Sequence, residues 1–379
     1  MTTLLRPFAL IASFVAGGLL LAACGSGSDS TDPSAQTLEV TITDDGCDPT
    51  DLKATAGPAT FTVSNDDSAI NNEFEVLDGA LIIGERENVT AGLSGDVSVN
   101  LDPGTYDIVC GNPGDRTPTG ELVVSGEKQA ATTNPQLQKA ADDYAKYVDE
   151  QAAILVTRTE DFAAAVKAGD VEKAKEIYEF ARVPYERIEP VAESFGVLDP
   201  AIDARVNDVA KGDPWTGFHP LEQALWVNGK LTGTDSNLAD ELVANVKKLQ
   251  RLAANNTYDP VTLANGAVEL LNEVSQSKIT GEEERYSHTD LTDFKANIDG
   301  AEEAFILLKP ALEDSDPELA SEIEERFADM NALLDQYKVK GDIYENYENV
   351  SEKQRQELSQ AVDALAQPLA EMGGQIVAQ

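Results

Sequence analysis

The sequence predicts two folded domains, an antiparallel β-sandwich followed by an all-helical domain, and therefore a multidomain protein of α and β structure. Two observations support this prediction. Apolar residues alternate with a period of two in short runs between residues 37 and 126, whereas from residue 137 onward they recur with the 3.6-residue period of a helix. At 379 residues the chain exceeds one ordinary domain, and its 42% of hydrophobic residues is enough for two cores.

The first 23 residues have the pattern of a secretory signal peptide. Arg6 precedes an apolar run over residues 8–21, no acid is present, and a Leu-Ala-Ala-Cys sequence ends at Cys24. The run is short for a membrane-spanning helix, which is the alternative. We therefore expect Cys24 to carry lipid, residues 24–36 to form a flexible tether, and the mature protein to be anchored on the extracytoplasmic face of the cell membrane.

The chain is strongly acidic, with 28 basic and 68 acidic residues and a net charge of −40. Removal of the signal peptide, which contains one arginine and no acid, changes this charge to −41. Nucleic acid is excluded as a partner, because binding to phosphates requires a basic face. The excess of acid attracts cations, but most of these carboxylates must be solvated surface and form no specific site.

The β-sandwich is expected over residues 37–126, where turn sequences rich in Asp, Gly and Pro separate the alternating runs. The residues predicted to face its core are Leu38, Val40, Ile42, Phe61, Val63, Phe74, Val76, Val97, Val99, Leu101, Tyr106, Ile108, Cys110, Leu122 and Val124.

Two cysteines, Cys47 and Cys110, remain once Cys24 is lipid-modified, and both lie in the sandwich. In an exported protein they indicate either a disulfide or a pair of metal-binding thiolates, and the sequence leaves both open. A blue-copper site also needs two histidines, and residues 37–126 contain none. Electron transfer by such a copper site is therefore excluded.

Residues 127–136 are polar and predict a linker, and the helical domain is expected over residues 137–379. Acids and prolines at the breaks between its helices are typical of helix starts. These breaks fall at Gly169-Asp170, Asp199-Pro200, Lys211-Gly212-Asp213-Pro214, 255–260 and 314–317.

One of only two histidines in the chain, His219, stands three residues before Glu222 at a predicted helix start. Pro220 fits the first helical turn, which places His219 at the cap and Glu222 about one turn later on the same face. An imidazole and a carboxylate so placed can share a metal ion.

A second acidic pattern lies in a helix expected to begin near Pro184. Glu186, Glu189 and Glu193 are spaced i, i+3 and i+7, and therefore share one face. A solvated surface is the ordinary explanation. However, Pro190 removes the hydrogen bond to the Glu186 carbonyl and predicts a kink, which favours a site.

These motifs resemble those of a known family. His219-Pro220-Leu221-Glu222 resembles the HxxE motif of the imelysin-like family, and residues 185–196 and 281–291 resemble segments of its members that serve as extracytoplasmic components of iron uptake. Residues 37–126 resemble the cupredoxin-like domain that precedes the helical domain in those members. The resemblance covers nearly the whole mature chain, and it implies two packed helical bundles.

The resemblance also implies a metal-binding cleft between helices whose ligands are Glu186, Glu189, Asp203, His219 and Glu222. Four carboxylates and one imidazole are a hard, oxygen-rich set that suits Fe³⁺, Fe²⁺, Mn²⁺ or Ca²⁺. Four acids repel one another, and a trivalent ion offsets that repulsion best. We therefore expect Fe³⁺, with Fe²⁺ as the alternative, and raised carboxylate pKa values in the empty site.

The resemblance suggests a further site at the rim of the sandwich. If Cys47 and Cys110 stay reduced, the two thiolates and an acid from Glu73 or Glu75 could hold copper or iron there.

Together these observations predict a lipid-anchored protein that captures iron outside the cell and delivers it to a membrane permease without catalysis. The resemblance adds a haem peroxidase as a further partner. Two other functions stay open. An HxxE metallopeptidase would need another histidine near the metal, and the sole candidate is His288, expected one helical turn after Glu284. A Ca²⁺-dependent binding protein for acidic polysaccharide would prefer calcium to iron.

Overall fold

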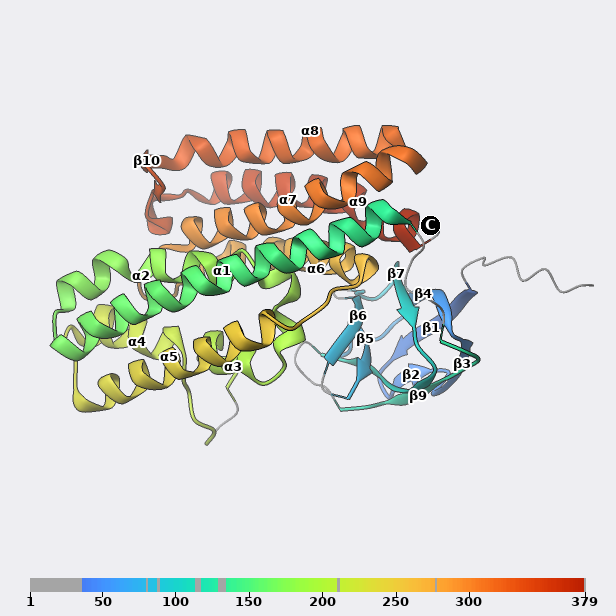
Figure 1. Ribbon diagram of the computed structural model, residues 1–379, viewed down its shortest axis with the longest axis horizontal. Coiled ribbons are helices and arrows are strands. Elements are labelled where there is room, and N and C mark those ends of the chain that lie inside the picture. The colour runs from blue at the N-terminus through green and yellow to red at the C-terminus, as the bar shows by residue number, and fades with distance from the viewer. Residues whose placement is uncertain are drawn as a thin grey trace, which may run out of the picture. The chain divides into compact units, whose positions relative to one another are not determined.

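The computed structural model of the chain describes residues 36–79, 81–86, 89–112, 117–128, 134–209, 212–276 and 278–377 (Figure 1). The expected signal peptide, Cys24 and all but the last residue of the expected tether lie outside this part of the chain. Among the described residues, no helix is both long and apolar enough to cross a bilayer.

The first part of the chain forms two β-sheets that pack face to face. One sheet has the strand order β2-β1-β4-β7, and the other has the order β3-β9-β8-β5-β6. The strands are β1 (Gln36–Thr43), β2 (Gly46–Asp48), β3 (Asp51–Thr55), β4 (Gly57–Asn65), β5 (Glu73–Asp78), β6 (Leu81–Arg86), β7 (Leu93–Leu101), β8 (Gly104–Gly111) and β9 (Gly120–Ser125).

The alternating apolar residues form the core between the two sheets, as the period of two predicts. Phe61 of β4 and Phe74 of β5 belong to different sheets, are fully buried, and have ring centroids 5.2 Å apart. A disulfide between Cys47 of β2 and Cys110 of β8 also joins the two sheets. The predicted sandwich is therefore confirmed.

Two strand pairs differ from the antiparallel arrangement that we expected. β1 pairs with β4 in parallel, and β3 pairs with β9 in parallel. Between β1 and β4 the chain forms β2 and then crosses to β3 in the other sheet, so that β4 starts from the same end as β1. The alternation of apolar residues indicates on which face of the sheet each side chain lies. Parallel and antiparallel strands have the same alternation, so the sequence pattern does not predict strand direction.

Helices follow from Pro135 onward. They are α1 (Pro135–Ala168), α2 (Val171–Glu186), the 3₁₀ helix η1 (Glu189–Phe195), α3 (Leu198–Asp203), α4 (Phe218–Gln223), the π-helical turn η2 (Ala224–Asn228), α5 (Gly233–Ala253), α6 (Pro260–Gln276), the 3₁₀ turn η3 (Lys278–Thr280), α7 (Asp290–Ser315), α8 (Pro317–Leu334) and α9 (Glu352–Val377). Between α8 and α9 lie the 3₁₀ turns η4 (Asp335–Tyr337) and η5 (Tyr347–Asn349) and the short strands β10 (Lys338–Lys340) and β11 (Ile343–Tyr344).

Capping residues set several of these helix ends. The Asn134 side chain accepts the N–H groups of Gln136 and Leu137 at the start of α1, and Gly169 ends that helix with a φ of 71°. The Asp170 side chain accepts the N–H of Lys173 and starts α2. Because Asp170 sets the start, α2 runs through Pro184 instead of beginning near it, as we had expected.

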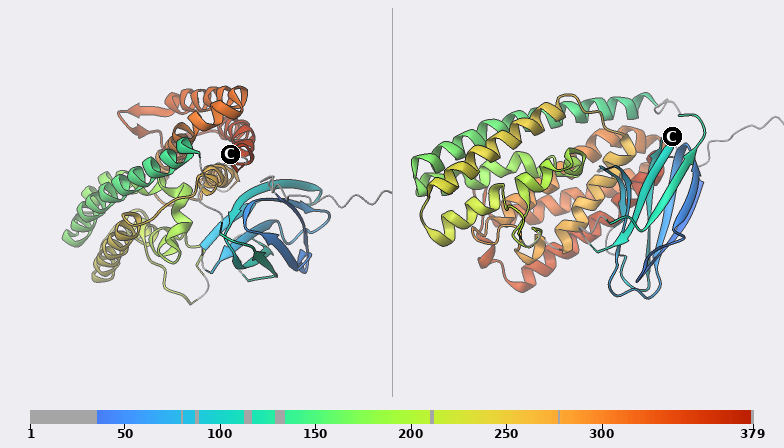
Figure 2. Two further views of the ribbon diagram at one scale, coloured as in Figure 1. Left: turned by 45° about the vertical axis from the view of Figure 1, so that its right-hand side comes forward. Right: turned by 90° about the horizontal axis from the view of Figure 1, so that it is seen from below.

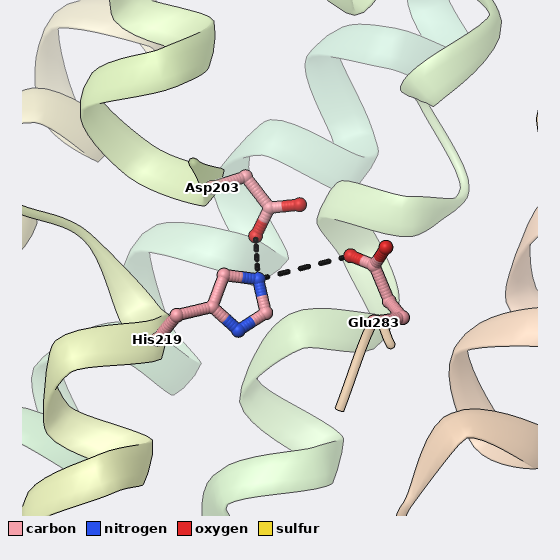
Figure 3. A group of neighbouring side chains, drawn as sticks. All are labelled: Asp203, His219 and Glu283. Carbon is pink, nitrogen blue, oxygen red and sulfur yellow. Dashed lines mark ion pairs between the residues drawn. The ribbon is translucent and has the colours of Figure 1, made fainter. Parts of the chain in front are cut away.

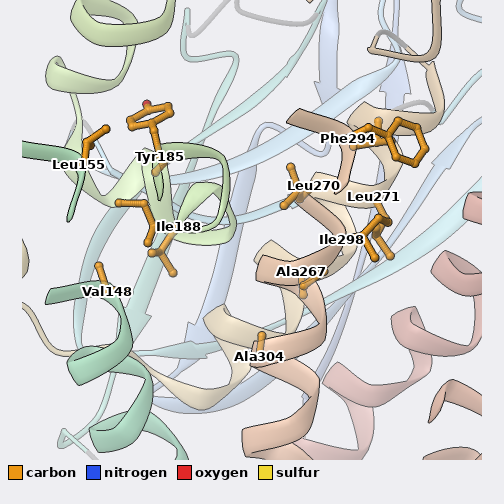
Figure 4. Packing of buried hydrophobic residues seen from close by; sticks show 14 of the residues in the cluster. Val148, Leu155, Tyr185, Ile188, Ala267, Leu270, Leu271, Phe294, Ile298 and Ala304 are labelled. Carbon is orange, nitrogen blue, oxygen red and sulfur yellow. The ribbon is translucent and has the colours of Figure 1, made fainter. Parts of the chain in front are cut away.

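The helices form two groups that meet at α7. α1 packs against α2 and α5, whereas α6 and α8 each pack against α7 and α9 (Figures 1 and 2). α7 also contacts α1 and α2. Buried apolar side chains fill the space between α1, the end of α2, α6 and α7 (Figure 4): Val148, Leu155, Tyr185, Ile188, Ala267, Leu270, Leu271, Phe294, Ile298 and Ala304.

The segment between η3 and α7 is a run of turns, where we had expected a helix that carries both Glu284 and His288. His288 has a φ of 59°, and its Nε2 lies 3.6 Å from Oε1 of Glu348. Glu284 points instead into the interior, where it is fully buried.

Candidate metal centre

The short helix α4 brings the HxxE motif against the end of α3. Its cap is Gly217, with a φ of 95°, so His219 lies inside the first turn and not at the cap that we had expected. A Cβ atom on Gly217 would lie 2.1 Å from the carbonyl oxygen of Ile202, which no side chain tolerates. Glycine therefore permits the close approach of the two backbones, and His219 comes to lie beside Asp203.

The imidazole of His219 is 2% exposed and has one nitrogen without a hydrogen-bond partner among the described residues. That atom, Nε2, lies 3.6 Å from Oδ1 of Asp203 and 3.7 Å from Oε1 of Glu283 (Figure 3). Both distances are too long for a hydrogen bond. Ligand atoms of His219, Asp203 and Glu283 all lie within 4.8 Å of one another, which is close enough for one metal ion to bind all three.

Glu222 lies on the other side of the imidazole. Its Oε2 is 3.3 Å from His219 Nδ1, and its Oε1 accepts the backbone N–H groups of Tyr286 and Ser287 at 2.8 and 2.7 Å. A carboxylate held in this way accepts the Nδ1 proton and leaves Nε2 to face Asp203 and Glu283. The carboxylates of Glu222 and Glu284 form a second group with His219 that could hold an ion, but both carboxylates already accept hydrogen bonds.

The charges around His219 change its protonation. Burial and the charge of Arg182 lower the pKa of His219, but Glu222, Glu283 and Asp203 outweigh them and raise it to about 9. Burial raises the pKa of Asp203 to about 6, despite the opposing charge of Arg182. Before any ion binds, the site therefore holds an imidazolium between acids, and a metal must displace that proton.

A fully buried arginine, Arg182 of α2, stands among five carboxylates. Its guanidinium pairs with Glu186 and Asp203, with Glu283 and Asp293 at 3.2 Å each, and with Glu284 at 2.7 Å. This cation offsets part of the mutual repulsion of the acids from which we expected raised pKa values. Burial alone would raise the pKa of Glu186, but the charges of Arg182 and Lys278 lower it. Burial would likewise raise the pKa of Glu222, but His219 and the backbone N–H groups of Ser287 and Tyr286 lower it. The expectation of raised pKa values is therefore wrong for Glu186 and Glu222, although it holds for Asp203.

A second buried cation, Lys278 of η3, is 3% exposed. Its Nζ lies 2.5 Å from Oε1 of Glu189, 3.4 Å from Oε2 of Glu186 and 4.0 Å from Oε2 of Glu283. Burial raises the pKa of Glu189 well above its usual value, although Lys278 opposes this shift. Lys278 therefore occupies the part of the centre to which Glu186 and Glu189 point.

Pro190 contributes to the centre through the backbone. It has no N–H to donate to the Glu186 carbonyl, and the α-helix ends there, so the kink that we expected is a change from α2 to η1. Asn297 of α7 donates its Nδ2 to that carbonyl at 3.1 Å and also to the carboxylates of Glu186 and Glu189. Because Pro190 cannot donate to it, the Glu186 carbonyl is available to accept the hydrogen bond from Asn297. This bond holds α7 against the acidic end of α2.

A narrow cavity of about 10 Å³ reaches His219 from outside, bordered by Arg205, Trp215, Glu282, Glu283 and Arg285 among others. Such a volume suits one water molecule or one ion, but no larger ligand. The cavity beside His219 is therefore large enough for one small ion.

Of the five ligands that the resemblance implied, the structure brings Asp203 directly to His219 and places Glu222 behind the ring. Glu186 joins them through Arg182, and Glu189 lies farther on, beside Lys278. Reasoning from the sequence missed Arg182, Lys278, Glu283, Glu284, Asp293 and Asn297. The spacing of Arg182 and Glu186, four residues apart on a helix, and the acidic run 282–284 were the available signals.

In the sandwich, the disulfide decides between the two alternatives for Cys47 and Cys110. The sulfurs are bonded to each other, so the shared thiolate site that we had considered is wrong for this structure. Glu73 and Glu75 are buried and lie close to Glu85, which we had not expected among the ligands, with carboxylate oxygens within 4.8 Å of one another. Without a thiolate or a histidine, this group has only hard oxygen atoms.

Comparisons with known proteins agree with both halves of the structure. The family model for Imelysin (Peptidase M75) matches residues 140–372, and the model for a cupredoxin-like domain matches residues 13–124. The iron uptake system component EfeO of Escherichia coli O1:K1 / APEC is 40% identical over 344 residues, which cover 89% of this chain and 90% of that protein. The EfeO protein of Shigella flexneri gives the same values.

A solved structure shows the same fold for the helical part. An iron-regulated protein A precursor from Parabacteroides distasonis ATCC 8503 superposes with a TM-score of 0.53 and 14% identity, covering 65% of this chain and 96% of that one.

Proposed function

The chain belongs to the imelysin family, with an N-terminal cupredoxin-like domain as in EfeO, and on this premise we propose that it captures iron outside the cell at the centre around His219. The relatives are named as components of an iron uptake system, and the proposal assigns this chain the same part. It binds and releases the ion without catalysis.

The single observation that carries the proposal is the buried Nε2 of His219, which has no hydrogen-bond partner among the described residues and faces the carboxylates of Asp203 and Glu283 at 3.6 and 3.7 Å. Evolution rarely buries an imidazole nitrogen without a partner, because the desolvated atom costs about 1–3 kcal/mol. A metal ion would satisfy that atom and both carboxylates at once.

The roles of the acids follow from their contacts. Asp203 and Glu283 are the carboxylate ligands, and Glu222 orients the imidazole through Nδ1. Glu186 and Glu189 supply negative charge near the ion, and either carboxylate could also coordinate it directly. The acids still outnumber Arg182, Lys278 and Arg205, so Fe³⁺ remains favoured over Fe²⁺.

Titration of the purified full chain with Fe³⁺ supplied as a weak chelate, and with anaerobic Fe²⁺, Zn²⁺ and Ca²⁺ in turn, tests this proposal. We expect iron to raise the melting temperature of the wild type, in proportion to ligand excess over the dissociation constant, and to do so far less in His219→Gln. The matched control is His288→Gln, since His288 lies outside the centre. A full iron-induced shift in His219→Gln would contradict the proposal.

The anchor and the partners complete the proposal. We propose that Cys24 carries lipid, that the protein stays at the extracytoplasmic face of the membrane, and that it passes iron to a membrane permease, with a haem peroxidase as a second partner. Cys24→Ser should release the folded protein from the membrane fraction. Retention of this variant with membranes after a salt wash would mean that another anchor exists.

Two other functions are less well supported. A zinc peptidase would place further nitrogen or sulfur ligands at the metal, and His288 is directed to Glu348 instead. Copper in the sandwich would need the soft or nitrogen ligands that the disulfide and the composition of that part remove. We therefore propose neither.

A further inference from the structure

Lys278 is the least expected residue of the centre. Lysine is almost never fully buried unless it is paired, and this one is 3% exposed. It faces three carboxylates, those of Glu186, Glu189 and Glu283, at 2.5 to 4.0 Å from Nζ. Three carboxylates around one point are the surroundings that proteins give to a hard metal ion.

Glu283 connects this position with the one at His219. Its Oε1 lies 3.7 Å from His219 Nε2 and 3.2 Å from the Arg182 guanidinium. Its Oε2 lies 4.0 Å from Lys278 Nζ and accepts a hydrogen bond from Arg205 at 3.1 Å. A carboxylate with one oxygen near each of two cation positions is able to bridge two metal ions, as carboxylates do in the metal centres of helical bundles. Here one of the two positions contains an ammonium group of the protein itself.

We propose that Lys278 permanently occupies a second cation position of this centre, so that the site takes one metal ion at His219 instead of a pair bridged by Glu283. The inference rests on the proposed function, because it takes the position at His219 to be the iron site. It assigns Lys278 the role of a specificity-determining residue that limits the number of ions.

The consequence is chemical. Paired metal ions bridged by carboxylates activate water or oxygen and hold their ions firmly. A single ion beside a fixed ammonium has fewer ligands available and meets repulsion from that charge, which favours release. Lys278 therefore favours a centre that binds one iron ion and releases it again, instead of a two-metal catalytic centre.

The test replaces Lys278 by methionine, which keeps a long apolar stem and removes the charge. The purified, metal-free full chain is dialysed against Mn²⁺, a hard ion with a spin signal, and bound manganese is counted per chain. We expect Lys278→Met to hold one ion more than the wild type, with a spin-coupled spectrum. The extra ion should be lost in Lys278→Met/Glu189→Gln, and Lys278→Arg should behave as the wild type.

The matched control is Lys309→Met, since Lys309 pairs with Glu324 and Glu313 at the surface. It should leave the manganese count unchanged. If Lys278→Met holds no more ions than the wild type, or if its additional ion shows no coupling, the inference is overturned.

Folding of the variant gives a second readout. Should Lys278→Met be unfolded without metal, refolding on addition of Mn²⁺ would show that an ion replaces the ammonium, and failure to refold in saturating Mn²⁺ would overturn the inference. A different result would contradict the proposed function. If His219→Gln binds as many ions as the wild type, the centre around His219 is not the iron site, whatever the number of ions bound by Lys278→Met.

Discussion

His219 should make the metal-free protein less stable at alkaline pH. Its pKa is about 9 in the folded state and 6.5 in the unfolded chain, because Glu222, Glu283 and Asp203 favour the imidazolium. A raised pKa contributes stability that is fully present below pH 6.5 and is lost as the pH rises through 9. Denaturant unfolding at pH 6.5 and 9.5 should show the wild type losing roughly 3 kcal/mol relative to His219→Gln. A difference that does not change with pH would mean that the folded imidazole is neutral.

Glu222 is predicted to act on iron through the orientation of the imidazole. Glu222→Gln keeps the shape of the side chain, but its amide can donate to Nδ1 and so move the imidazole proton to Nε2, where the ion should bind. Iron affinity should fall about ten- to hundredfold, as for other partners of metal ligands. Glu282→Gln removes the same charge at the edge of the cavity without touching the ring, and calorimetry should find its affinity unchanged. If both variants lost the same iron affinity, Glu222 would act only through its negative charge and not through the orientation of the imidazole.

At this scale the sequence predicted the residues near the ion better than those that compensate their charge. His219 and Glu222 were found because histidine is rare in this chain and the HxxE spacing is specific. Arg182 and Lys278 were missed because lysine and arginine are ordinarily surface residues. The neighbouring sequence contains no pattern that predicts their burial. Glu283 was missed for the same reason, inside a run of three glutamates.

At the scale of elements, the short helix α4 depends on Gly217. Gly217→Ala should destabilise the protein by at least about 1–2 kcal/mol, the cost of a left-handed backbone for a residue with a Cβ, and the contact with Ile202 adds to it. α4 should also shift away from α3, which weakens iron binding. Gly233→Ala is the control, because nothing lies within 4 Å of that position. Thermal melts with and without iron measure both effects, and a variant as stable as the control would contradict the account of α4.

The ends of the long helices could be predicted, whereas the irregular segments could not. Caps such as Asp170 and Asp316 act within one turn, so the sequence contains the whole signal. The turns over 281–287 are held by distant contacts instead, such as the backbone N–H groups that donate to Glu222. A helical reading of that segment failed because tertiary contacts outweigh local propensity there.

At the scale of the whole molecule, the disulfide should add to the stability that the hydrophobic core gives the sandwich. It closes a separation of 63 residues between Cys47 and Cys110, and restricting the unfolded chain to that extent is worth about 4 kcal/mol. Cys47→Ser/Cys110→Ser should lower the unfolding free energy of the sandwich by that order and leave iron binding at His219 intact. Two accessible thiols in the oxidised wild type would contradict the disulfide.

The order of sandwich and helices followed from the sequence because the two hydrophobic periods differ so clearly. The two parallel strand pairs did not, since the path from β1 to β4 depends on which sheet β3 joins. Contacts between distant segments determine which sheet β3 joins, and the alternation of apolar residues along the chain is the same in either case.

The buried Arg182 also bears on how the helical part folds. Its carboxylate partners come from α2, from the end of α3, from the turn after η3 and from α7, up to 111 residues away along the chain. A guanidinium with only some of these partners would be a dehydrated charge, which costs several kcal/mol. No intermediate that contains α2 without α7 can therefore bury Arg182 cheaply. We expect the helices around it to assemble late and together, and amide protons on α2 and α7 to exchange in one common opening.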